Sequence, residues 1–105
     1  MLNGLWHTHF VAGPAHGDGM AVLRDGEILG GDPTHTYTGS YRLDGALLYA
    51  NVRVSPYPAS GSSDPVEGPL TFFLSGSVAG DAGTLSGHTD QKTEWKVAVD
   101  LHRAA

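Results

Sequence analysis

An alternation of apolar and polar side chains recurs along most of this chain, and turn residues interrupt it at short intervals. Such a two-residue period places successive side chains on opposite faces of an extended strand. The alternating segments cover residues 5–11, 19–24, 27–30, 37–41, 46–55, 70–79, 84–89 and 93–102. No segment repeats apolar residues at helical spacing. The pattern therefore predicts an all-β protein of eight short strands.

The connections between these segments are mostly of hairpin length. Asp25-Gly26 is a typical two-residue hairpin signal, and glycine-containing turns also lie at residues 43–45 and 80–83. Consecutive hairpins make an antiparallel meander, which loses its exposed edges when it closes on itself. We predict a small eight-stranded antiparallel up-and-down barrel, with a two-sheet β-sandwich as the alternative.

The interior of such a barrel is filled by its own side chains or holds one small ligand. The alternation places several large aromatic side chains on the inward face, where they are candidate ligand contacts. These residues are Trp6, Phe10, Tyr37, Tyr41, Phe72 and Trp95.

A glycine-rich corner joins the third and fourth segments, at Gly30, Gly31, Asp32 and Pro33. Two adjacent glycines predict a β-bulge, with positive φ, or a close approach of the backbone. Proline favours extended geometry in the residue before it, and the Asp32 carboxylate is placed to accept the Thr34 N–H in an Asx-type turn. We interpret Asp32 as a turn residue, and a catalytic or ligand-binding acid is the alternative.

Apolar residues also fall on the outward face. Phe73 lies between two inward residues, and Leu47 and Tyr49 lie opposite the inward set of the segment at 46–55. A contiguous exposed apolar cluster usually marks a contact surface. We therefore predict a partner or dimer face at these three positions, with a symmetric homodimer as the expected arrangement.

Composition limits the class of protein. A chain of 105 residues fits one domain, residues 1–105, and the net charge of −5 without a basic stripe argues against binding to nucleic acid. The lack of cysteine fits a reducing compartment. No signal-like or membrane-spanning apolar run is present, so we expect a cytoplasmic protein without membrane contact.

Residues 56–69 contain four prolines, three serines and two glycines without alternation. This composition predicts a mobile loop with fast amide exchange.

The residues that could act in catalysis or metal binding do not form a known catalytic pattern. His7 and His9 share one strand face, as two ligands of a transition metal could, but no third ligand has motif spacing. No serine lies in a Gly-x-Ser-x-Gly context, and the glycine pairs do not lead into a helix that could bind phosphate. We expect no enzymatic activity, no metal site and no cofactor.

The order of three motifs resembles the GrlR-like family of small negative regulators of type III secretion genes. The motifs are Gly17-Asp18-Gly19-Met20-Ala21-Val22-Leu23-Arg24-Asp25-Gly26, then Gly30-Gly31-Asp32, then Tyr37-Thr38-Gly39-Ser40-Tyr41. The resemblance covers residues 3–54 and, less closely, residues 70–76. It implies a lipocalin-like eight-stranded barrel, often dimeric, that binds a protein partner. The founding regulator is understood to hold its partner through a run of acidic residues, where this chain has Arg42-Leu43-Asp44-Gly45 with one acid.

Two functions follow as expectations. The first is a regulatory interaction module that binds and restrains a transcriptional activator, as the resemblance implies. The second is a carrier or sensor of a small apolar molecule held in the barrel.

Overall fold

The computed structural model describes residues 2–56 and 69–105, and these residues form eight β-strands. Most of the loop predicted at 56–69 lies outside the described residues. The strands are β1 (Gly4–Ala12), β2 (Ala15–Arg24), β3 (Glu27–Gly31), β4 (His35–Asp44), β5 (Leu47–Pro56), β6 (Leu70–Ala79), β7 (Ala82–Thr89) and β8 (Val97–Arg103).

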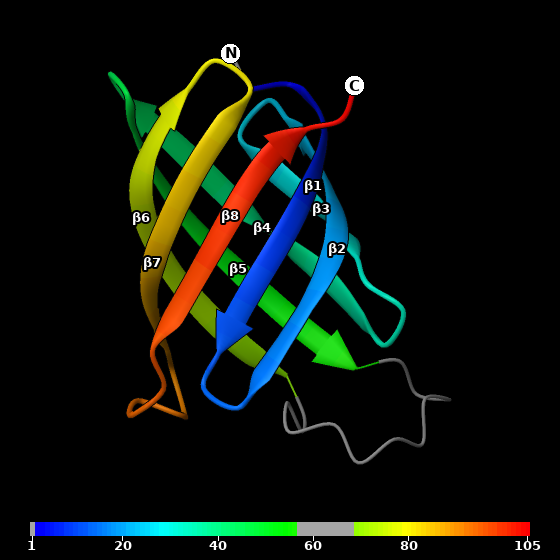
Figure 1. The fold of residues 1–105 in the computed structure, drawn as a ribbon, viewed down its shortest axis with the longest axis vertical. Helices are drawn as coiled ribbons and strands as arrows, with labels where there is room; N and C mark the ends of the chain where they lie inside the picture. Colours follow the sequence, from blue (N-terminus) through cyan, green and yellow to red (C-terminus); the bar gives the residue numbers. More distant parts are fainter. Residues whose placement is uncertain (1, 57–68) are drawn as a thin grey trace.

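The strands form one closed barrel. Each strand pairs antiparallel with the next, and β1 closes the sheet by pairing with β8 from Trp6↔Arg103 to Ala12↔Val97. Figure 1 shows the blue β1 beside the red β8, with both chain ends at the same end of the barrel. The predicted up-and-down barrel is therefore confirmed, and the sandwich alternative is wrong. Within residues 2–56 and 69–105 no helix is long and apolar enough to span a membrane.

The two largest differences from the predicted strand boundaries are at the starts of β2 and β8. β2 begins at Ala15 rather than residue 19, because Gly17 and Gly19 occupy inward positions and give no apolar signal. β8 begins at Val97 rather than residue 93. The Trp95 N–H donates to the Lys92 carbonyl at 3.0 Å in a turn, so Trp95 precedes the strand.

Trp6 closes the end of the barrel that carries both termini. Its side chain is fully buried, and its indole N–H donates to the Leu2 carbonyl at 2.9 Å. The Arg103 guanidinium lies 4.6 Å from the centre of the Trp6 ring and is held by Asp81 and the Asn3 carbonyl. These contacts satisfy the polar groups around a large buried ring, as buried indoles generally require.

Glycines on the inward face allow neighbouring strands to approach closely. At Gly30, Gly39, Gly76 and Gly87 a Cβ atom would lie 1.8–2.0 Å from a carbonyl oxygen of the adjacent strand. Real Cβ atoms do not approach a backbone oxygen so closely, so any side chain at these positions would force the neighbouring strand to shift. Close approaches of this kind allow the strands the curvature that a small closed barrel needs.

The bulge and positive φ expected at the glycine pair are wrong. Gly30 and Gly31 both pair regularly with β2 and β4, and neither has a positive φ. The alternative, a close backbone approach, explains Gly30, whose Cβ would meet the Met20 carbonyl oxygen. The chain turns after the pair, at residues 32–34.

Candidate functional site

The barrel interior contains a cavity of about 520 Å³. Voids in a packed protein core rarely exceed the size of a water molecule, so packing does not account for a space this large. Its volume lies within the range of roughly 300–1,000 Å³ that is typical of small-molecule sites. The side chains of this eight-stranded barrel therefore leave room for one small ligand.

Four of the six aromatic residues expected inside the barrel line this cavity: Phe10, Tyr37, Tyr41 and Phe72. The other two, Trp6 and Trp95, are not among the described lining residues. Trp6 fills the closed end, and Trp95 is half-buried beside Gly13 in the β1–β2 turn. The two tryptophans thus pack at opposite ends of the barrel.

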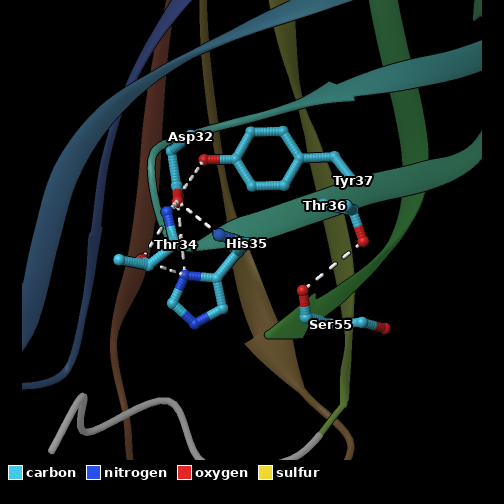
Figure 2. A network of polar contacts seen from close by, with 6 residues as sticks. All are labelled: Asp32, Thr34, His35, Thr36, Tyr37 and Ser55. Carbon is cyan, nitrogen blue, oxygen red and sulfur yellow. Dashed lines mark hydrogen bonds and ion pairs between the residues drawn. The ribbon is translucent and has the colours of Figure 1, made fainter. Parts of the chain in front are cut away.

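A buried polar network occupies the corner between β3 and β4. The Oδ1 atom of Asp32 accepts the backbone N–H groups of Thr34 and His35, each at 2.8 Å, and the Thr34 hydroxyl at 3.2 Å. Its Oδ2 atom accepts the Tyr37 hydroxyl at 2.6 Å. Figure 2 shows these donors around one carboxylate, and the bond from Thr34 N–H confirms the predicted Asx-type turn.

This network lies on the inward face of β4 and is shielded from solvent. The side chains of Asp32 and His35 are 5% and 4% exposed, and Tyr37 is also buried. Between His35 and Tyr37, Thr36 points away from the network and donates to the Ser55 carbonyl at 3.4 Å (Figure 2). The two-residue period of β4 therefore brings His35 and Tyr37 together on the cavity side.

Hydrogen bonding decides the charge state of Asp32. Burial alone raises the pKa of a carboxyl group. Here hydrogen bonds from Tyr37 and the Thr34 amide, together with the adjacent His35 imidazole and amide, lower the pKa of Asp32 below its ordinary value. Asp32 is therefore ionised at neutral pH, and a carboxylate with this many donors is a weak base.

The mouth of the cavity lies beside this corner. β3 is five residues long and pairs with β2 only from Met20↔Gly31 to Arg24↔Glu27. The described lining residues that are also exposed are His16 and Asp18 of β2 and Pro33 of the corner. Among the described residues, the exposed part of the lining therefore lies at the first half of β2 and at the turn at residues 32–34.

One buried hydroxyl in the cavity wall has no hydrogen-bond partner among the residues that the structure describes. Thr8 lies on the inward face of β1, is 7% exposed and lines the cavity. Its Oγ1 atom makes no hydrogen bond to any described residue. Thr8 lies opposite Gly19 in the β1–β2 ladder. The Tyr37 hydroxyl lies over Gly19, with its oxygen 2.6 Å from the position that a Cβ atom there would take. Buried polar atoms are nearly always hydrogen-bonded, so an unpaired one in a cavity indicates a position where a ligand or water binds.

His7 and His9 lie on the outer face of β1, where both approach the same carboxylate oxygen of Asp18. The distances are 3.3 Å from His7 Nε2 and 3.0 Å from His9 Nδ1. Among the described residues, no group of three or more His, Cys, Asp or Glu side chains is arranged to hold a metal ion.

The three residues expected at a contact face all point outward from β5 and β6. Leu47 is 48% exposed and Phe73 is 39% exposed, whereas Tyr49 is half-buried. Polar groups cover part of this surface: the Arg42 guanidinium lies 4.3 Å from the Tyr49 ring centre, and Phe73 stacks on His88 at 5.3 Å. The outer face is therefore a mixed aromatic and polar surface.

Fold and cavity together define a class: a small up-and-down β-barrel with a partly open interior of ligand size. Comparison with known proteins assigns it to no family, because no protein-family model and no curated protein matches the sequence.

Sequence reasoning identified most of the aromatic lining but did not bring the polar residues together. His35 has the same parity as Tyr37 and Tyr41, so the alternation, extended two residues upstream, would have placed it inside. Thr8 was on the correct face between Trp6 and Phe10, and a hydroxyl residue amid aromatic neighbours was the available signal.

Proposed function

We propose that this protein binds one small, largely apolar molecule in the barrel interior and acts as a carrier or sensor of it. The observation that carries the proposal is the 520 Å³ cavity. Apolar side chains form most of its wall, including Leu48, Val52, Phe72 and Leu74. Burial of apolar ligand surface against such a wall is the main source of affinity in sites of this kind.

The proposal can be tested with N-phenylnaphthylamine, a neutral apolar dye whose fluorescence rises on burial. Saturable binding of one dye per barrel is expected. Ala50 is buried and lines the cavity, so Ala50→Leu should occupy ligand space and weaken dye binding about tenfold, which corresponds to about 1.4 kcal/mol.

Ala98→Leu is the matched control, because Ala98 is an exposed residue on the outer face of β8 and receives the same added atoms. Its dye affinity should equal that of the wild type. Equal weakening by both substitutions, or no saturable binding at all, would contradict a ligand site in the barrel.

A regulatory interaction module is the second candidate function. It is supported by the resemblance to the GrlR-like family and by the exposure of Leu47 and Phe73 on one outer face. We infer that a second copy of the chain covers this face, since symmetric dimers are the commonest assembly of soluble chains. The turn at residues 42–45 has one acid, so it lacks the acidic run that the resemblance associates with holding an activator.

Native mass spectrometry of the protein purified from its own host separates the two functions. A retained small molecule supports the carrier or sensor. A retained polypeptide supports the interaction module, and its absence together with a monomeric mass contradicts that module.

A further inference from the structure

We propose that the cavity selects neutral or cationic amphipathic molecules with a hydroxyl or amine group, and that it discriminates against carboxylates such as fatty acids. This inference rests on the proposed ligand-binding function and names the chemistry of the ligand.

The first observation is the distribution of polarity around the cavity. Polar groups come from one side, from Thr8 of β1 and from Asp32, His35 and Tyr37 at the β3–β4 corner. The opposite wall, from β5 to β8, contributes aliphatic residues such as Leu48, Leu74, Leu85 and Val99. A ligand that matches both sides has an apolar body and one polar end.

The second observation is the unpaired hydroxyl of Thr8. A threonine hydroxyl can donate one hydrogen bond and accept others, so it can pair with an alcohol or an amine. Its Oγ1 atom is buried without a partner among the described residues, and a ligand that supplies one removes the cost of an unsatisfied polar group. An alkane of the same size gains nothing from this position.

The third observation is the sign of the charges. The described lining residues include two carboxylates, Asp18 and Asp32, and neither lysine nor arginine. The Asp18 carboxylate is largely exposed and lies against His7 and His9 on the outer face, whereas Asp32 is buried on the cavity side and, because its pKa is lowered, ionised. A ligand carboxylate would be desolvated near a like charge, and the described part of the lining offers no lysine or arginine to neutralise it. An ammonium group is attracted by the buried Asp32 carboxylate.

Two imidazoles, those of His16 and His35, also line the cavity, together with the hydroxyls of Tyr37 and Tyr41. The measurement is therefore made at about pH 8, because a higher pH favours the neutral form of an imidazole. At this pH the buried Asp32 carboxylate is ionised, because its pKa is lowered.

The test uses wild-type protein loaded with N-phenylnaphthylamine and compares three competitors of equal chain length: dodecanol, dodecylammonium and dodecanoate. Dodecanol and dodecylammonium should displace the dye at concentrations about tenfold or more below that of dodecanoate, corresponding to about 1.4 kcal/mol of discrimination. Failure of the dye to bind contradicts the proposed function itself. Dye binding with equal displacement by dodecanoate leaves that function intact and overturns the selectivity.

Substitutions then test the two groups separately. Thr8→Val should weaken dodecanol binding about tenfold, whereas Thr8→Ser should retain it, because serine keeps the hydroxyl. Thr38→Val, on the exposed outer face of β4, is the control and should change neither affinity. Unchanged dodecanol binding in Thr8→Val would overturn the role of this hydroxyl.

Asp32→Asn should raise dodecanoate affinity relative to dodecylammonium. If this variant does not fold, the wild-type ratio of dodecanoate to dodecylammonium still decides the charge selectivity. An unchanged ratio in a folded Asp32→Asn protein would contradict the role of this carboxylate.

Discussion

Replacing Thr8 by valine should make the ligand-free protein more stable. An unsatisfied buried polar group costs about 1–3 kcal/mol, and valine has nearly the same shape without the hydroxyl. The cavity is partly open, so water can reach part of its wall and the lower end of this range applies. We therefore expect the free energy of unfolding to rise by about 1 kcal/mol in Thr8→Val.

The opposite sign is expected for Thr8→Ser, which keeps the hydroxyl and loses a buried methyl group worth about 0.8 kcal/mol. Both variants can be measured by urea denaturation and by thermal melting, where 1 kcal/mol corresponds to roughly 4–8 °C in a domain of this size. Thr38→Val on the outer face should stay within about 0.5 kcal/mol of the wild type. A clear loss of stability in Thr8→Val would show that the hydroxyl is hydrogen-bonded in the ligand-free protein, and would refute the reasoning.

Three further predictions concern the corner, the inward glycines and the outer face. Asp32→Asn should cost about 1–3 kcal/mol in urea unfolding, because an amide nitrogen cannot accept the donors around the carboxylate. Because the pKa of Asp32 is lowered in the folded protein, its charge stabilises the fold above the unfolded carboxyl pKa of about 3.9. This contribution is lost as the pH falls through the lower folded pKa. The difference in free energy of unfolding between the wild type and Asp32→Asn should therefore narrow there. Gly30→Ala should lower the free energy of unfolding by at least about 2 kcal/mol, since its Cβ would lie 2.0 Å from the Met20 carbonyl oxygen. Gly45→Ala is the control, because Gly45 has a positive φ but open space around it, and it should cost about 1 kcal/mol. Equal losses in the two variants would contradict the close-approach argument. Phe73→Glu should convert the proposed dimer to a folded monomer in sedimentation velocity, and a wild type that is monomeric at micromolar concentration would rule out this interface.

The fold was predictable because its main determinants are local. Alternation in β4, β5 and β6 and the Asp25-Gly26 turn specify hairpins, and hairpins in series leave few topologies besides a barrel or a sandwich. Closure itself depends on pairing between β1 and β8, which no local pattern encodes. Sequence reasoning could therefore favour the barrel without excluding the sandwich.

The candidate site was less predictable, because it depends on contacts between strands. Asp32 had the turn chemistry that sequence suggested, but its bond to Tyr37 depends on the direction in which β4 leaves the corner. The size of the cavity depends on how the inward glycines let the strands bend, and at Gly30 the sequence suggested an irregular backbone where the ladder is regular. The interior volume therefore depends on contacts between strands, which no local sequence pattern shows.

The inward glycines have a consequence for protein engineering. The small inward residues of this barrel are of two kinds. Beside Gly30, Gly39, Gly76 and Gly87 the neighbouring backbone already fills the space where a side chain would lie. Beside Ala21 and Ala50 the space belongs to the cavity. Pocket size and barrel shape are therefore encoded at different positions. Substitutions at Ala21 and Ala50 can therefore change which ligands fit the pocket while the curvature of the barrel is unchanged.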